Sequence, residues 1–187
     1  MGFGYRCTFM VQTIKYEIVK TLDEVEIRHY PKIFVAKVNN SEFDSFGLLF
    51  RFISGSNIQK KKVKMTTPVV SQETSQEIKM TSPVLTDFSN EGYMAFVMPQ
   101  EFTFETTPVP LDGRVKIEEL PERDIAVLRF SGSWSEDRFE AKKKQLIEEL
   151  TREKVKTKGA VFTMLYNPPF TPTFLRRNEV AIEVQPK

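Results

Sequence analysis

The side chains that most often carry out chemistry are scarce in this chain of 187 residues, which contains one histidine, His29, and one cysteine, Cys7. A neutral imidazole can ligate a metal ion, so His29 could contribute a single ligand. One histidine cannot build a histidine-rich metal site or a Ser-His-Asp triad, and one cysteine excludes an internal disulfide and a cysteine-based zinc site.

Carboxylates are plentiful, and Glu118, Glu119 and Glu122 lie close together in the sequence. No nucleophile–base pair, phosphate-binding glycine loop or dinucleotide-binding fingerprint accompanies them. The Ser-Gly-Ser steps at 54–56 and 131–133 are typical of turns and helix caps. We therefore predict that the protein is not an enzyme, unless a buried glutamate lines its binding groove.

Phenylalanine is concentrated in a segment that predicts the first helix. Asn40 or Ser41 can cap this helix, which continues to about Ile53, and Gly55 offers a left-handed stop. A helix that is apolar around most of its circumference is either buried or covered by something outside its own fold. Its apolar residues are Phe43, Phe46, Leu48, Leu49, Phe50, Phe52 and Ile53.

The remaining pattern predicts short strands and a second helix. A cap at Ser135 begins the second helix, which runs to about Glu153, and Trp134 is placed to pack on Phe139 beside the cap. Apolar, β-prone runs bounded by turn residues predict the strands. They are expected at residues 16–19, 24–29, 33–38, 93–98, 114–119, 124–130, 160–166 and 179–184.

The sequence contains two internal repeats. KMTTPVV at 64–70 returns as KMTSPVL at 79–85, and two matched strand ends around a polar loop indicate a hairpin-like pair. VEIRHYP at 25–31 aligns with VKIEELP at 115–121, an offset of 90 residues. A duplicated unit tends to form a groove at its seam, where ligands bind.

The repeats predict an α+β fold made of two strand–strand–helix–strand units. We expect one domain over residues 1–187, with pseudo-repeats at about 16–100 and 110–187. Gly113, among prolines, marks the seam between them. Residues 1–12 precede the first repeat and need not be ordered.

Composition excludes several classes of protein. The chain has 27 basic and 25 acidic residues, so its net charge of +2 gives no long-range attraction to nucleic acid. The basic run KKKVK at 60–64 is typical of a solvated loop. No stretch approaches the ~20 apolar residues of a membrane span, and no signal peptide is recognisable. We expect a cytoplasmic protein that binds neither nucleic acid nor membranes.

The motifs together resemble the SOUL/haem-binding protein family over nearly the whole chain, from about Tyr16 to Val184. This resemblance implies a pseudo-twofold α+β fold, with a distorted antiparallel β-barrel or pair of sheets flanked by two helices. It also implies kinship with bacterial effector-binding domains, which take up small molecules. The motifs are YEI at 16–18, EIRHYP at 26–31, FGLLFRFISGSN at 46–57, KMTTPV, KMTSPV, and YNPPFTPTFLRRNEV at 166–180.

The resemblance also implies a site. His29 in EIRHYP corresponds to a histidine proposed as axial ligand of haem iron in some members. The tetrapyrrole is expected in a shallow apolar groove beside the first helix and the C-terminal loop. Arg51 and Arg176 are expected to receive its propionates, whereas Arg177 is expected to pair with a carboxylate near Glu179. The matching groove residues are Phe43, Phe46, Gly47, Phe50, Met98, Met164, Tyr166 and Phe174.

The expected function is therefore non-catalytic, non-covalent binding of haem or another tetrapyrrole by a monomeric carrier, buffer or sensor. One alternative is a sensor domain for a different planar aromatic ligand. Another is a protein–protein adaptor that binds its partner through the first helix.

Overall fold

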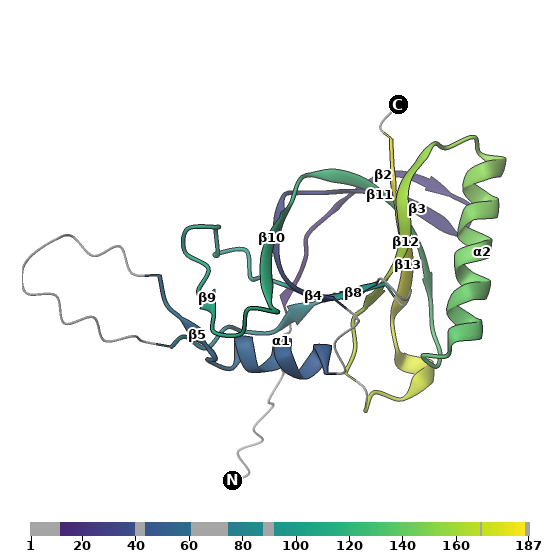
Figure 1. Ribbon diagram of the computed structural model, residues 1–187. Helices are drawn as coiled ribbons and strands as arrows, with labels where there is room; N and C mark the ends of the chain where they lie inside the picture. The colour runs from purple at the N-terminus through teal and green to yellow at the C-terminus, as the bar shows by residue number, and fades with distance from the viewer. Residues whose placement is uncertain (1–11, 40–43, 61–74, 88–91, 169, 186–187) are drawn as a thin grey trace, which may run out of the picture.

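The computed structural model describes residues 12–39, 44–60, 75–87, 92–168 and 170–185. Its main element is an antiparallel sheet that curls into a half-barrel (Figure 1). The strands of this sheet are β2 (Glu17–Leu22), β3 (Val25–Tyr30), β4 (Ile33–Asn39), β7 (Val84–Thr86), β8 (Tyr93–Val97), β10 (Lys116–Leu120), β11 (Arg123–Phe130), β12 (Thr157–Leu165) and β13 (Asn178–Val184).

The order across the nine-stranded sheet is β10-β4-β8-β7-β12-β13-β11-β3-β2. Two short pairs lie outside it, namely β1 (Gln12–Thr13) with β6 (Thr81–Ser82) and β5 (Asn57–Ile58) with β9 (Val109–Pro110). The expected α+β class is confirmed, with an open half-barrel as the form of the sheet. The copy of the KMT repeat at 79–85 supplies β6 and the start of β7, and the copy at 64–70 lies outside the described residues.

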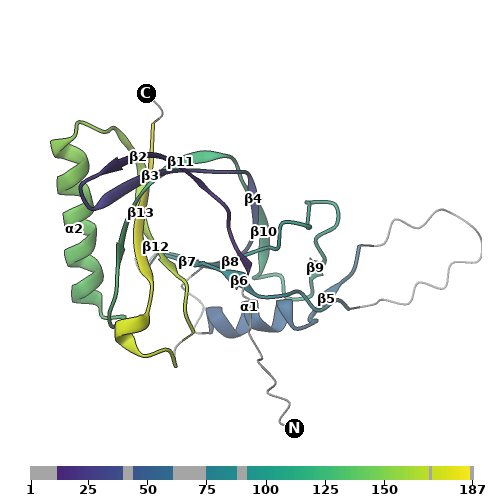
Figure 2. The same cartoon turned by 180° about the vertical axis from the view of Figure 1, so that it is seen from behind.

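Two helices cover the outside of the curl (Figure 2). The first, α1 (Ser45–Ile53), packs on β4 and β8, and the second, α2 (Glu136–Arg152), packs on β13 and β11. A short 3-10 turn, η1 (Thr173–Leu175), interrupts the loop between β12 and β13. Neither α1 nor α2 is long and apolar enough to cross a bilayer.

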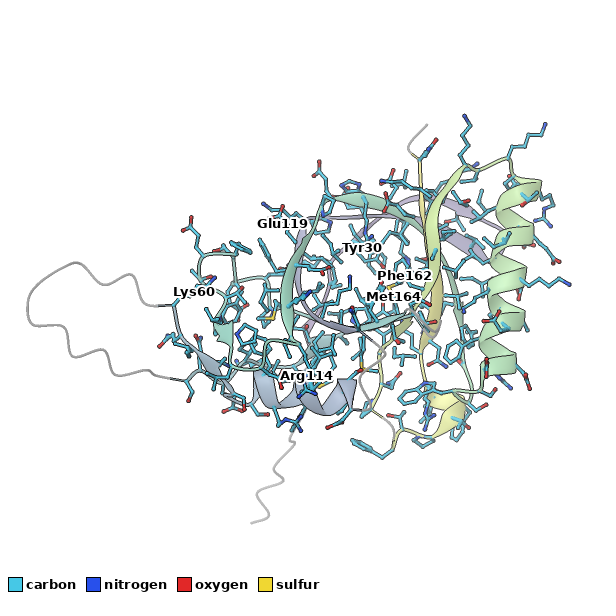
Figure 3. All side chains as sticks on the ribbon, in the orientation of Figure 1. Tyr30, Lys60, Arg114, Glu119, Phe162 and Met164 are labelled. Carbon is cyan, nitrogen blue, oxygen red and sulfur yellow. The ribbon has the colours of Figure 1, made fainter. Side chains whose placement is uncertain are left out.

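Three buried apolar clusters hold these layers together in the described part of the chain. One lies between the sheet and α2 and includes Val25, Ile27 and Leu146. A second lies under α1 and includes Leu49, Phe52 and Phe96. The third fills the concave side of the half-barrel, where Tyr30, Phe162 and Met164 meet (Figure 3).

The pairing of β3 and β4 with β11 and β10 follows the duplication. Tyr30 pairs with Arg123, and Ile33 pairs with Leu120. In the offset of 90 residues, Tyr30 corresponds to Leu120 and Ile33 corresponds to Arg123. The Tyr30–Arg123 pair is therefore equivalent to the Leu120–Ile33 pair, with the two repeats exchanged. Each strand pair is followed by a helix, α1 after β4 and α2 after β11. The repeated strand–strand–helix order expected from the sequence is therefore present in the fold.

The ends of the helices differ in part from the sequence-based expectation. Asp44, and not Asn40 or Ser41, caps α1, because its side chain accepts a hydrogen bond from the Gly47 amide at 2.9 Å. Asn40 and Ser41 lie outside the described residues. Gly55 has a φ of 113°, which confirms the left-handed stop. Ser135 occupies the cap position of α2, but its side chain makes no capping hydrogen bond.

Candidate functional site

The concave side of the half-barrel contains charged residues as well as apolar ones. Alternation along β3 places Val25 and Ile27 under α2 and turns Arg28 and Tyr30 to the opposite face. Glu179 on β13 is completely buried and receives a hydrogen bond from Arg28 Nη1 at 3.0 Å. Two distant sequence motifs therefore meet inside the fold.

Both carboxylate oxygens of Glu179 have several donors. Oε2 accepts from Arg28 and from the hydroxyl of Tyr166 at 2.9 Å. Oε1 accepts from Arg177 Nε at 2.9 Å and from Arg177 Nη2 at 2.7 Å. Charge-assisted hydrogen bonds of this kind satisfy a buried carboxylate that would otherwise be costly. The expectation for Arg177 needs a small correction, because its partner is Glu179 itself.

Tyrosine rings surround the two guanidinium groups. Arg28 lies over the ring of Tyr16, with 4.3 Å between the guanidinium carbon and the ring centroid, and Arg177 lies over Tyr166 at 4.0 Å. Burial raises the pKa of the Tyr166 hydroxyl, and the neighbouring Glu179 carboxylate raises it further. Burial alone would lower the pKa of Arg28, but the Glu179 carboxylate outweighs it and the pKa is raised. The cluster is therefore a set of ion pairs with a neutral, donating tyrosine.

One small hollow lies on the concave side of the half-barrel. The hollow lined by Tyr30, Ile33, Phe162 and Met164 has a volume of about 10 Å³. This volume is enough for roughly one water molecule and far below the several hundred Å³ of a ligand pocket. The sequence made catalysis conditional on a buried glutamate in the groove. Glu179 is buried, but both of its carboxylate oxygens already accept hydrogen bonds from Arg28, Tyr166 and Arg177.

The outer face of α1 presents two aromatic rings to solvent. Phe46 and Phe50 are 44% and 49% exposed, and their rings are stacked 6.1 Å apart with an interplanar angle of 11°. Phe46 also makes an edge contact with Phe96 of β8. The other apolar residues of the helix, Leu48, Leu49, Phe52 and Ile53, are buried against the sheet. One side of α1 is therefore core, and the other is an apolar surface.

The loop between β12 and β13 presents a second apolar surface. Phe170 and Phe174 are 87% and 74% exposed, and Leu175 is exposed as well. This loop and α1 lie at the same end of the molecule (Figures 1 and 2). Exposure of several large apolar side chains at one end of a molecule is typical of binding surfaces.

Two arginines border these surfaces. Arg51, one turn after Gly47 on α1, pairs with Asp44 at 3.3 Å, and both side chains are more than half exposed. Arg176 donates to the Thr171 carbonyl at 2.8 Å and lies over the ring of Trp134, 4.6 Å from its centroid. An exposed pair such as Arg51–Asp44 is weak, so Arg51 can exchange its partner for another carboxylate.

A small hollow flanks α1 on the side of Arg51. Its volume is about 290 Å³, at the low end for a small-molecule pocket. Residues from α1 and from the segment around β9 and β10 line it, namely Leu48, Arg51, Phe52, Ser56, Pro110, Leu111, Asp112 and Val115. Hydrogen bonds from Arg114 lower the pKa of Asp112 to about 2, so this hollow carries a carboxylate at neutral pH.

His29 lies elsewhere, on β3 between β2 and β11. Its Nδ1 is 2.7 Å from Oδ1 of Asp124, its register partner on β11. The hydrogen bond to Asp124 raises the pKa of His29, and the charges of Glu122 and Glu17 raise it further. Because α1 packs on β4 and β8, the structure does not bring His29 together with Phe46 and Phe50.

The other residues predicted for the groove are divided between layers. Met98 is buried under α1, whereas Met164 and Tyr166 belong to the concave side of the half-barrel. Gly47 is at the start of α1, and Phe43 lies outside the described residues. Of the predicted set, Phe46, Phe50 and Arg51 belong to α1, and Phe174 and Arg176 belong to the loop between β12 and β13.

Sequence reasoning missed Arg28 and Glu179 as members of one site. Their only signal was position, since Arg28 shares a strand face with Tyr30 in EIRHYP and Glu179 directly precedes the apolar run at 180–182. Neither observation says that the two residues meet. Among the residues that the structure describes, no three histidine, cysteine, aspartate or glutamate side chains are grouped to hold a metal ion.

Comparisons with known proteins agree with this architecture. The family model for the SOUL heme-binding protein matches residues 11–183. Heme-binding protein 2 of Homo sapiens is 30% identical over 163 residues, which span 83% of this chain and 75% of that protein.

Solved structures with a similar fold are more distant in sequence. A hydrolase from Listeria innocua has a TM-score of 0.56 at 14% identity, with 89% of this chain and 94% of that chain covered. The C-terminal domain of EcmrR has a TM-score of 0.55 at 10% identity, with 92% and 99% covered. At these identities the similarity shows a shared fold alone.

Proposed function

Because the chain belongs to the SOUL heme-binding protein family, we propose that it binds haem or another tetrapyrrole without a covalent bond, on the surface formed by α1 and the loop 167–176. The observation that carries this proposal is the stacked pair Phe46 and Phe50, half-exposed on a helix whose other side is core. A planar macrocycle would cover apolar surface of the kind that folded domains seldom leave open to water.

The residues at this surface suit the two parts of a tetrapyrrole. Phe46, Phe50 and Phe174 offer aromatic contacts to the macrocycle. Arg51 and Arg176 offer guanidinium groups to its carboxylates, which planar forks bind well. The iron of a bound haem would supply redox and ligand-exchange chemistry. The small hollow at Tyr30 and Met164, with a volume of about 10 Å³, supports an outer site.

We further propose that the protein acts as a carrier, buffer or sensor and not as an enzyme. Glu179 has no oxygen without a donor, because Arg28, Arg177 and Tyr166 all bind it. A general base needs an accessible lone pair within reach of a substrate proton. This buried glutamate therefore supports a structural role.

A titration with haemin and with iron-free protoporphyrin IX tests the proposal. Saturable 1:1 binding of both, followed by the Soret band and by quenching of Trp134, is expected, and Trp134 is the one tryptophan of the chain. Phe50→Ala should weaken binding about tenfold, the loss expected for an aromatic contact with a ligand. Phe104→Ala is the matched control, because Phe104 is also about half exposed, 57% against 49% for Phe50, but contacts Lys60. Absence of saturable binding by the wild-type protein would refute the proposal.

The hollow beside α1 favours a second candidate, a sensor for a smaller planar ligand. Its volume of about 290 Å³ is too small for a complete tetrapyrrole but suits a one- or two-ring molecule. Leu111→Trp would fill the hollow without touching Phe46 or Phe50. If this variant keeps haemin binding but loses binding of small aromatic dyes, the two sites are separate.

A further inference from the structure

We infer that Glu179 is a positioning residue for the proposed tetrapyrrole site, because it fixes the loop 167–176 from inside the half-barrel. The inference rests on the proposed function, since this loop carries Phe174 and Arg176. The buried cluster of Glu179 and its hydrogen-bond partners would then support ligand binding without touching the ligand.

The loop is closed at its base by the two residues that flank it. Tyr166 at its start and Arg177 at its end both bind Glu179, one on each carboxylate oxygen. The backbone amide of Tyr166 donates to the Arg177 carbonyl at 3.4 Å, and the Arg177 amide donates to Asn167 Oδ1 at 2.7 Å. The two ends of the loop are therefore held together by one buried carboxylate.

The neighbouring residue of β13, Asn178, is held on the other face of the sheet by the segment between β11 and α2. Successive side chains of a strand point to opposite faces, so Asn178 points away from Glu179. Its Oδ1 accepts from Trp134 Nε1 at 2.8 Å, and its Nδ2 donates to the Gly132 carbonyl at 3.2 Å. Arg176 in turn lies over the ring of Trp134. The base of the loop is thus fixed on both sides of the sheet.

The middle of the loop has hydrogen bonds of its own, from the Thr171 amide to the Pro168 carbonyl and from Arg176 Nε to the Thr171 carbonyl. Phe170, Phe174 and Leu175 are exposed, and no residue of η1 is buried. These hydrogen bonds join loop residues to one another, so the placement of the loop on the fold depends on its base. A preorganised wall loses less conformational entropy when a ligand binds, which raises affinity without any new contact.

The cluster supplies a matched pair of residues for a test. Arg28 and Arg177 bind the same carboxylate, on Oε2 and Oε1 respectively. Arg177 ends the loop, whereas Arg28 belongs to β3 and contacts no loop residue through this bond. A loss of hydrogen bonding at Arg177 should therefore affect the loop, and the same loss at Arg28 should affect only the stability of the fold.

Arg177→Lys and Arg28→Lys each keep the charge and remove the planar fork. For each variant, the dissociation constant of haemin would be measured by Soret titration and Trp134 quenching. The unfolding midpoint in urea and the rate of chymotryptic cleavage at the exposed Phe170 and Phe174 would be measured without ligand. We expect Arg177→Lys to weaken haemin binding roughly tenfold and to accelerate cleavage, the consequence of losing a charge-assisted hydrogen bond. Arg28→Lys should lower the unfolding midpoint with wild-type affinity and wild-type cleavage.

Equal affinities for both variants and the wild type, or equal losses in both variants, would overturn the inference. If Arg177→Lys fails to fold, Tyr166→Phe is used in its place, because Tyr166 is the other end of the loop. This substitution removes one hydrogen bond to Glu179 and keeps the aromatic ring. If the wild-type protein does not bind haemin, the proposed function fails, and the cleavage rates still decide whether Glu179 holds the loop.

Discussion

At the scale of single residues, the alternation of β3 separates two roles within the motif EIRHYP. Arg28 and Tyr30 turn to the concave side of the half-barrel, where Arg28 binds Glu179. His29 points to the opposite face and pairs with Asp124. Adjacent residues of one motif therefore serve different surfaces, and a role assigned to one of them does not extend to its neighbours.

The position of His29 predicts that haemin binding survives its removal. Glu17, Glu122 and Asp124 surround the imidazole, and their charges would repel the propionates of haem. We expect His29→Ala to bind haemin with an affinity within about twofold of the wild type, by Soret titration. Loss of the Soret shift in this variant, with protoporphyrin IX binding unchanged, would instead identify His29 as an axial ligand.

The His29–Asp124 pair also predicts a pH dependence of stability. The folded-state pKa of His29 is raised above 6.5 by its hydrogen bond to Asp124, so the pair stabilises the fold fully below the unfolded pKa. This contribution is lost as the pH rises through the folded pKa. Urea unfolding of the wild type and Asp124→Asn should differ most near pH 5 and least near pH 8. A difference that grows with pH would contradict this assignment.

At the scale of elements, α1 shows why a short helix carries a glycine near its start. A Cβ at Gly47 would lie 2.1 Å from Oδ2 of Asp44, the residue that caps the helix. The resemblance places Gly47 among the expected groove residues. The structure provides a local reason for glycine at this position, which is space for the capping carboxylate.

This geometry predicts a coupled effect of two substitutions. Alanine in place of glycine should stabilise a helix by about 1 kcal/mol. At Gly47 this gain should be offset by loss of the Asp44 cap, which is worth about 1 kcal/mol. We therefore expect Gly47→Ala to leave the free energy of unfolding nearly unchanged in the wild type and to raise it in an Asp44→Ala background. Equal stabilisation in both backgrounds would show that the cap does not depend on Gly47.

At the scale of the whole molecule, the two repeats are interleaved in one sheet. The strands of the first repeat are divided into β4-β8-β7 and β3-β2, and β12-β13-β11 of the second repeat lie between them. Neither half has a continuous sheet of its own. The duplication is therefore a feature of one cooperative structure, in which each half completes the other.

Interleaving predicts that fragments divided at the seam do not fold alone. Residues 1–112 and 113–187, expressed separately, should each lack dispersed amide signals in NMR spectra and cooperative thermal unfolding. Mixing them should restore both, because the mixture supplies every strand of the sheet. Independent folding of either fragment would show that the halves are separate domains.

The sequence by itself determined most of the elements, the duplication and the family. Local periodicity located β3, β4, β11, β13 and both helices to within a few residues, because helix and strand patterns depend on neighbours in the chain. The offset of 90 residues predicted the repeated strand–strand–helix order. The exposed aromatic residues of α1 were also foreseen, since no single packing partner can cover so many apolar positions.

Only the tertiary structure decided which side chains share a site. Arg28 and Glu179 are 151 residues apart, and they meet because β11 lies between β3 and β13. The same curl directs Met164 and Tyr166 inward, away from Phe46 and Phe50. Burial and ion pairing depend on contacts between distant strands, and a one-dimensional pattern does not specify which strands become neighbours.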